Sequence, residues 1–176
     1  MTIQSIALIG TGVMGMGIAQ IVAQAGVEVR LFDAKAGAAE QGLAKLTVTL
    51  EKLHSKGKIT EQQLADTLSR FVILEKIEDV AGVDMVVEAI IENLEIKQSL
   101  FRQLESIVSE DTILASNTSS LSVTAIASIL KYQGRVAGFH FFNPVPLMKI
   151  AEVIAGLATD EQVVVDLLEL THRMGH

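Results

Sequence analysis

The sequence predicts an α/β protein with a doubly wound, mostly parallel sheet and a helical hairpin inserted after the second strand. Three observations favour this fold class. Short apolar runs alternate with helix-length segments, which is typical of a parallel sheet covered by helices on both faces. A Gly-x-Gly-x-x-Gly sequence joins the first apolar run to the first helical segment. A length of 176 residues with 49% hydrophobic content suits one domain with a sizeable core, so we predict a single domain over residues 1–176.

The individual elements follow from apolar periodicity. The long stretch from residue 37 to residue 70 has near-helical spacing that is interrupted around Gly57, and Thr60 with Gln63 forms a capping-box pattern, so two helices are expected there. A further helix start is expected at residues 159–161. The predicted strands are 6–9, 27–32, 71–74, 83–89, 112–115, 136–141 and 150–154, and the remaining helical segments are 16–23, 77–81 (a brief helix or turn), 93–109, 123–130 and 161–173.

Composition and charge exclude several classes of protein. The net charge is −7 and is spread along the chain, and there is one Tyr and no Trp, so we expect no nucleic-acid partner. No apolar run has the roughly 18 residues that a membrane span requires, and no basic residue precedes Arg30, so neither a membrane segment nor a secretory signal is expected. The absence of cysteine excludes disulfides and fits a cytoplasmic protein. We expect no metal site.

The glycine-rich turn predicts a dinucleotide site. Gly10 allows a tight strand-to-helix turn, Gly12 leaves room for a pyrophosphate, and Gly15 lets the helix pack closely on the strand. Asp33 follows the next predicted strand, where a carboxylate can accept the ribose hydroxyls of adenosine and would repel a 2′-phosphate. The predicted cofactor is therefore NAD rather than NADP. The alternative is that the glycines form a turn with no ligand and that Asp33 is a surface aspartate.

A histidine and a glutamate suggest acid–base chemistry near the carboxyl ends of the strands. His140 alone is compatible with a core histidine that is satisfied by a carbonyl group. Glu152 lies in an otherwise apolar strand, where an unpaired buried carboxylate would be costly, so we expect it to pair with His140. Such a carboxylate fixes the imidazole tautomer and leaves the other ring nitrogen to act as a general base. Alternatively, Glu152 points to solvent on an edge strand.

Other polar residues at this edge have two interpretations. Residues 116–120 (Ser-Asn-Thr-Ser-Ser) exceed what helix capping needs, so one hydroxyl could face substrate, although Ser120 or Ser122 is expected to be an N-cap. Glu88 and Glu92 could equally be solvated loop charges. Lys56 is either a surface lysine or a partner for a phosphate.

Three segments together resemble the L-3-hydroxyacyl-CoA dehydrogenases, including 3-hydroxybutyryl-CoA dehydrogenases. They are the glycine turn at residues 10–15, the Ser-Asn-Thr-Ser-Ser stretch at 116–120, and residues 138–152, which carry His140 and Glu152 at the family's spacing. The resemblance implies a dinucleotide-binding (Rossmann) fold. It also implies that the chain corresponds to the N-terminal part of the family's length. A further all-helical domain, which dimerises, covers the acyl-CoA and supplies a catalytic asparagine, would be absent from this sequence.

The resemblance also implies roles for individual residues. His140 would remove the proton of the 3-hydroxyl group as hydride leaves C3 for the nicotinamide, and Glu152 would orient the imidazole. Lys56 would meet the CoA moiety, and Thr49 stands where some members have a serine in a similar role. Ser119 would contact both the cofactor and the 3-oxygen of the substrate, and Asn143 would act in the catalytic centre and on the cofactor. The implied cofactor contacts are Gly10, Thr11, Gly12, Val13, Met14, Gly15, Asp33, Glu92, Lys97, Ser119 and Asn143.

Three functions are therefore compared. The first is the NAD-binding domain of a 3-hydroxyacyl-CoA dehydrogenase that acts on acyl-CoA substrates in fatty-acid metabolism, with the longer protein forming a homodimer and this chain alone showing little or no activity. The second is another β-hydroxyacid dehydrogenase of the gulonate type. The third is a nucleotide-binding module without turnover, against which the His140–Glu152 pair argues.

Overall fold

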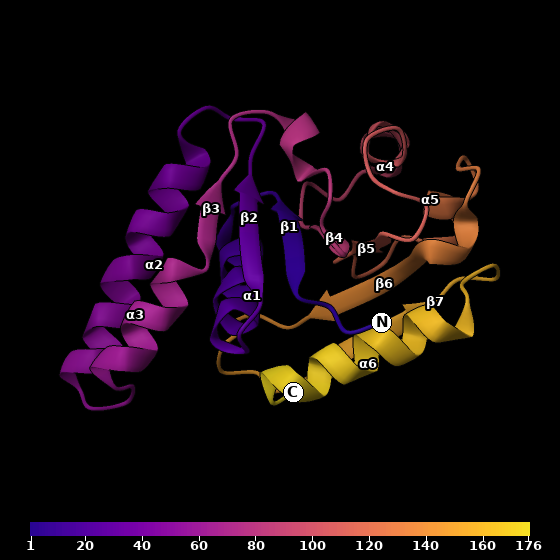
Figure 1. Ribbon diagram of the computed structural model, residues 1–176. Helices are drawn as coiled ribbons and strands as arrows, with labels where there is room; N and C mark the ends of the chain where they lie inside the picture. Colours follow the sequence, from indigo (N-terminus) through magenta and orange to yellow (C-terminus); the bar gives the residue numbers. More distant parts are fainter.

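A computed structural model describes all 176 residues as one seven-stranded sheet covered by helices on both faces (Figure 1). The strand order is β3-β2-β1-β4-β5-β6-β7, in which all neighbours are parallel except the antiparallel pair β6 and β7. The predicted doubly wound, mostly parallel sheet is thus confirmed. The strands are β1 (Ser5–Ile9), β2 (Glu28–Phe32), β3 (Phe71–Ile73), β4 (Met85–Glu88), β5 (Ile113–Ser116), β6 (Val136–Phe141) and β7 (Ala151–Ala155).

Two layers of helices cover the sheet. One layer contributes to a cluster of 26 buried apolar residues that includes Ile18, Leu50 and Leu167, and the other to a cluster of 15 that includes Phe101 and Ile126. The first layer holds α1 (Val13–Gln24), α2 (Ala38–Ser55), α3 (Glu61–Ser69) and α6 (Glu161–Met174), and the second holds α4 (Leu94–Glu105), α5 (Val123–Ala127) and the 3₁₀ helix η1 (Ile77–Val80); a second 3₁₀ turn, η2, spans Gln133–Arg135. No helix has both the length and the apolar character that a membrane span requires.

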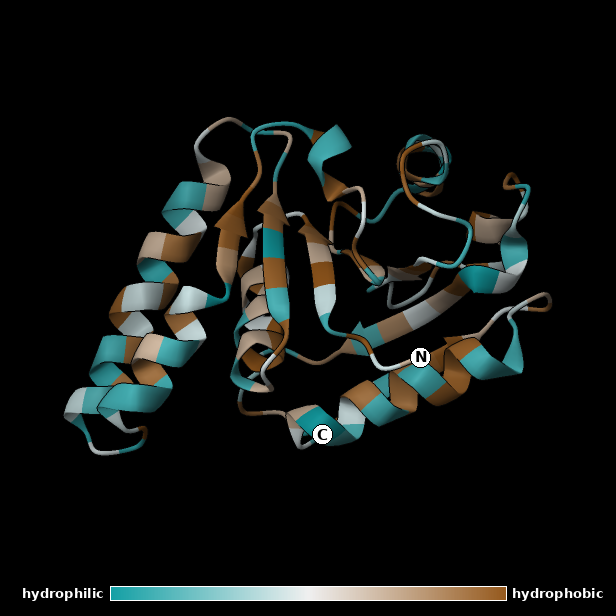
Figure 2. Ribbon diagram, in the orientation of Figure 1, coloured by the Kyte–Doolittle hydropathy of each residue, from teal (hydrophilic) through white to brown (hydrophobic).

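The helices α2 and α3 form an antiparallel pair beside β3 (Figure 1). The chain reverses near Gly57, whose φ of 67° lies in the left-handed region that glycine adopts without a steric penalty. Figure 2 shows teal and brown bands along α2, α3 and α6, as expected for helices with one buried and one solvent-facing side.

Side-chain caps fix several helix starts. The predicted capping box at α3 is present, because Thr60 accepts from the Gln63 N–H while the Gln63 side chain accepts from the Thr60 N–H. Asn93 caps α4 and Ser122 caps α5. The cap predicted at residues 159–161 differs, because Asp160 makes no capping bond and the Thr159 hydroxyl instead donates to the Val136 carbonyl at 2.6 Å.

Two predicted helices are too long at their carboxyl ends. The segment expected to reach residue 109 ends at Glu105, and the segment expected to reach residue 130 ends at Ala127. In both cases apolar side chains continue past the helix, and Val108 and Leu130 are buried as part of the turns that lead into the next strands. The apolar pattern therefore predicted burial of these side chains correctly, but it did not predict the length of the helices.

Candidate active site

The glycine turn places an open helix N-terminus at the carboxyl edge of the sheet. A Cβ atom on Gly10 would lie 2.6 Å from the Ala89 carbonyl oxygen, and one on Gly15 would lie 1.9 Å from the Gly10 carbonyl oxygen. A Cβ on Gly12 would meet no atom within 4 Å. The protein's own packing thus requires glycine at 10 and 15, whereas Gly12 opens onto free space at the start of α1. Unpaired N–H groups and the helix dipole favour an anion there.

Asp33 at the end of β2 is hydrogen-bonded to the glycine turn. Its Oδ2 accepts from the backbone N–H and the hydroxyl of Thr11 at 2.8 and 2.9 Å, and its Oδ1 accepts from the Lys35 N–H at 2.9 Å. Partial burial raises the pKa of Asp33, but these hydrogen bonds and the nearby Lys35 charge lower it more, so the pKa lies below its ordinary value. The carboxylate is therefore ionised at neutral pH and also holds the turn in place, a contact that sequence reasoning did not anticipate.

Two adjoining cavities run along this edge. The larger, about 940 Å³, is lined by Gly10, Gly12, Asp33 and apolar residues of the neighbouring loops. The smaller, about 370 Å³, shares Met14, Ala89 and Ile90 with it. The smaller cavity is also lined by five of the residues singled out from the sequence, namely Glu92, Lys97, Ser119, His140 and Asn143. Residues from four separate strand ends thus meet at one point of the sheet.

His140 and Glu152 are in contact, as expected. They are direct partners in the antiparallel register of β6 and β7, and His140 Nδ1 lies 2.8 Å from Glu152 Oε2. The edge of the His140 ring also packs against Phe142, with ring centroids 4.6 Å apart. Nε2 has no hydrogen-bond partner within the protein, and the imidazole lines the smaller cavity. This arrangement leaves one ring nitrogen available for proton transfer.

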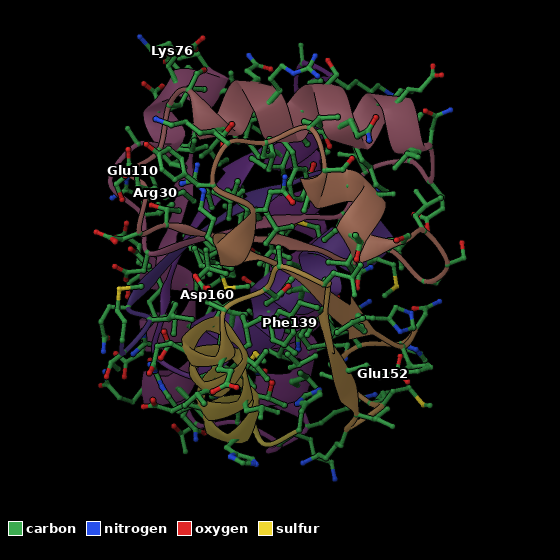
Figure 3. All side chains as sticks on the ribbon, turned by 90° about the vertical axis from the view of Figure 1, so that its right-hand side faces the viewer. Arg30, Lys76, Glu110, Phe139, Glu152 and Asp160 are labelled. Carbon is green, nitrogen blue, oxygen red and sulfur yellow. The ribbon has the colours of Figure 1, made fainter.

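Burial of Glu152, the expected cause of its pairing with His140, is wrong. The Glu152 side chain is 54% exposed, because β7 is the edge strand and this residue faces outward. Figure 3 shows Glu152 at the margin of the molecule and Phe139, from the neighbouring strand, in its interior. Burial therefore does not force the contact. Cross-strand register places the two side chains together, and His140 is the more shielded partner at 16% exposure.

Glu92 organises the loop at residues 116–120. It accepts hydrogen bonds from the Thr118 hydroxyl, from the Ser119 N–H at 3.2 Å and from the Ser120 hydroxyl at 3.3 Å. Partial burial raises its pKa, but the Thr118 hydrogen bond and the Lys97 ammonium outweigh that effect, so the pKa lies below its ordinary value. Glu92 is thus not a free loop charge. The Ser119 hydroxyl makes no bond within the protein.

Glu88 and Lys97 form a buried ion pair that the sequence did not reveal. Lys97 Nζ lies 2.5 Å from Glu88 Oε1, and the side chains are 1% and 0% exposed. The interpretation of Glu88 as a solvated loop charge is therefore wrong. It is the last residue of β4, which lies at the centre of the sheet between β1 and β5, and the sequence pattern alone does not give that strand order.

Asn117 is a second residue whose role was missed. Its side-chain oxygen accepts from the Phe141 N–H at 2.9 Å, and its own N–H donates to the Glu88 carbonyl at 2.8 Å. It therefore ties the ends of β4 and β6 to the loop after β5, and it lines the cavity that also holds His140. Its position in the polar stretch after a strand was the only available signal.

The two residues expected to meet CoA are placed differently. Thr49 lines a third cavity of about 610 Å³ between α1, α2 and residues 143–146. Lys56 follows the end of α2, is exposed and lines none of the three cavities. Seven residues separate it from Thr49, which corresponds to about 10 Å along the same face of a helix. The structure therefore brings Thr49, but not Lys56, to a cavity.

Comparisons with known proteins agree with this architecture. Residues 5–176 match the family model described as "3-hydroxyacyl-CoA dehydrogenase, NAD binding domain". The chain is 45% identical over 175 residues to a protein of Bacillus subtilis named "Probable 3-hydroxybutyryl-CoA dehydrogenase", covering 99% of this chain and 61% of that relative. It is 43% identical over 166 residues to the 3-hydroxybutyryl-CoA dehydrogenase of Clostridioides difficile, covering 94% of this chain and 59% of the relative.

A crystal structure of 3-hydroxybutyryl-CoA dehydrogenase from Escherichia coli superposes with a TM-score of 0.97 at 43% identity, covering 99% of this chain and 37% of that one. The chain thus spans about three fifths or less of the relatives it matches. Since the family model covers residues 5–176, the chain belongs to the 3-hydroxyacyl-CoA dehydrogenase family and comprises its NAD-binding domain.

Proposed function

We propose that this domain serves the oxidation of an (S)-3-hydroxyacyl-CoA to the corresponding 3-oxoacyl-CoA. The observation that carries the proposal is the His140–Glu152 pair, whose free Nε2 lies on the same cavity as Ser119 and Asn143. NAD, when bound, accepts the hydride that leaves C3 of the substrate. The proton of the 3-hydroxyl group passes to His140 Nε2 and from there to solvent, so one hydride and one proton leave the substrate in each turnover.

The other residues of the cavity position the imidazole, the substrate and the cofactor, and they stabilise the imidazolium. Glu152 accepts a hydrogen bond from the Nδ1–H of His140, which selects the tautomer with a basic Nε2 and stabilises the imidazolium that forms. The free Ser119 hydroxyl is suited to donate to the 3-oxygen. Asn143 is exposed on the cavity rim, where its carboxamide can contact the nicotinamide. The glycine turn and Asp33 hold the pyrophosphate and the adenosine ribose.

The CoA moiety is proposed to follow α2. Thr49 and Lys45 line the cavity of about 610 Å³ beside the nucleotide turn, and Lys56 would meet a CoA phosphate at the exposed end of that face. The relatives' greater length supports a further proposal: residues outside the matched region complete the acyl pocket, supply additional catalytic groups and form a homodimer.

The test compares proton transfer with cofactor binding. This chain alone and a chimera carrying the unmatched C-terminal part of the Bacillus subtilis relative would be assayed for acetoacetyl-CoA reduction by loss of NADH absorbance. We expect turnover in the chimera and a loss of about 100-fold or more in its His140→Gln variant, since that is the usual contribution of a positioned general acid–base group. NADH affinity of the variant should stay within about twofold of the parent, well below the tenfold that corresponds to about 1.4 kcal/mol.

A matched control is His172→Gln, because His172 is exposed on α6 and lines none of the three cavities. It should leave turnover unchanged. Full activity in His140→Gln would overturn the assignment of proton transfer. NADH binding without any turnover in the folded chimera would instead favour a nucleotide-binding module.

A further inference from the structure

Glu88 is the most deeply buried acidic side chain at the carboxyl edge of the sheet. Its carboxylate is fully hydrogen-bonded: Oε1 accepts from Lys97 Nζ at 2.5 Å and from the Ile90 N–H at 2.7 Å, and Oε2 accepts from the Ser116 hydroxyl at 2.6 Å. Glu88 does not itself line the cavity that holds His140. Each of its partners belongs to a segment that forms that cavity.

Two routes lead from Glu88 to the loop that carries Ser119. In the first, Lys97 bridges Glu88 to Glu92 at 3.4 Å, and Glu92 accepts from the Ser119 N–H. In the second, the Ser116 hydroxyl donates to Glu88 and accepts from the Thr118 N–H at 3.2 Å. The loop is therefore held from both sides by one buried carboxylate.

Stability alone is a poor explanation for this ion pair. The desolvation of two charges offsets most of their attraction, so apolar residues of similar volume usually serve a core as well or better. The neighbouring positions Val86 and Val87 of β4 are buried and apolar. An ionic pair confined to the end of the strand, beneath the cavity, is better explained by the groups that it orients.

We propose that Glu88 is a positioning residue that, through Lys97 and Ser116, fixes Glu92 and Ser119 in the geometry that receives the nicotinamide half of the cofactor. The inference rests on the proposed function, because it assigns the smaller cavity to the nicotinamide. It predicts a selective effect: loss of Glu88 weakens ligands that carry the nicotinamide ring and spares those that carry only the adenosine, pyrophosphate and ribose.

The experiment titrates the chain with NADH and with ADP-ribose by calorimetry. Glu88→Gln removes the charge at nearly constant volume, and Ser116→Ala removes one hydroxyl and keeps the ion pair. We expect NADH to bind about tenfold or more weakly to Glu88→Gln and several-fold more weakly to Ser116→Ala, in line with the loss of a charge-assisted hydrogen bond. ADP-ribose affinity should stay within about twofold in both, because Asp33 is held by Thr11 and Lys35, and neither Glu88 nor Ser116 makes a hydrogen bond to it.

Two controls separate positioning from general destabilisation. Thr112→Val deletes an equally buried hydroxyl that donates to the Val83 carbonyl, just before β5 and therefore at its opposite end. Asp166→Asn neutralises a buried carboxylate on α6. Both should lower the melting temperature without changing the ratio of NADH to ADP-ribose affinity.

The outcomes are distinct. Equal weakening of both ligands in Glu88→Gln and Ser116→Ala, or an unchanged affinity ratio, would show that Glu88 has only a structural role and would overturn the inference alone. If Glu88→Gln does not fold, Ser116→Ala decides by the same ratio. If the parent chain binds neither ligand, the proposed function fails and the inference fails with it.

Discussion

The glycine turn allows a sharp separation of folding from cofactor binding. Gly12 has φ −70° and ψ −171°, which an alanine adopts without strain, and a Cβ there would meet nothing within 4 Å. A Cβ on Gly15 would lie 1.9 Å from the Gly10 carbonyl oxygen, which is a backbone atom and cannot turn away as a flexible side chain can. Gly12→Ala and Gly15→Ala therefore add the same methyl group, three residues apart, with opposite consequences for the fold.

The magnitudes follow from these distances. For Gly12→Ala, the smaller unfolded-state entropy stabilises by about 0.4–1 kcal/mol, and loss of glycine at the N-cap costs a similar amount, so the net change should be below about 1 kcal/mol. For Gly15→Ala, relieving the contact requires a backbone shift of about 1 Å. Overpacking typically costs about 1–3 kcal/mol, and because this clash is with backbone we expect the upper end, about 3 kcal/mol. In a chain of this length, that corresponds to a fall in melting temperature of about 6–12 °C.

Cofactor binding should be weakened in Gly12→Ala, the variant whose fold is retained. The methyl group of Gly12→Ala occupies the space that a pyrophosphate needs at the start of α1, so NADH affinity should fall at least about tenfold, or 1.4 kcal/mol. Melting curves and NADH titrations on the two variants measure both effects. A Gly12→Ala protein that unfolds, or that binds NADH like the parent, would refute the assignment of this open space to the phosphates.

Three further predictions concern the cofactor, acid stability and a helix cap. Asp33→Ala should weaken NADH binding about tenfold and abolish the preference for NADH over NADPH, because the variant lacks the charge that repels a 2′-phosphate. Titration with both nucleotides measures the preference, and an unchanged preference would contradict the prediction. Burial raises the pKa of Asp33, Glu92 and Glu105, but hydrogen bonds and nearby cations lower it more, to below the ordinary value in each case. The unfolded chain therefore binds more protons than the folded protein in acid. These carboxylates stabilise the fold above about pH 4.5, and this stabilisation is lost as the pH falls through their lowered pKa values. The urea concentration at the midpoint of unfolding should therefore be similar at about pH 7 and pH 5 and lower at about pH 3.5. Thr60→Ala removes half of the capping box of α3 and should cost about 1 kcal/mol in the free energy of unfolding, with NADH affinity unchanged; a change in that affinity would contradict its placement away from the nucleotide cavities.

Local patterns explain what could be predicted. The glycine turn, the alternation of strands and helices and the capping box at Thr60 depend on residues within a few positions of each other, so the sequence specifies them directly. The pairing of His140 with Glu152 also follows from local structure, because the two residues lie on adjacent strands of an antiparallel pair. Burial of Glu152 does not cause this contact, because a side chain on an edge strand such as β7 can face solvent.

The fold class, the nucleotide turn and the candidate proton-transfer pair can all be inferred from the order of the residues. Which charges are buried depends on how the strands and helices pack together. Glu88 is fully enclosed because β4 lies between β1 and β5, and it is matched by Lys97 from the helix that follows. Whether a carboxylate at a strand end is solvated or enclosed depends on strand order and on the helices packed above it. Those are set by contacts between segments far apart in the chain, which no local pattern records.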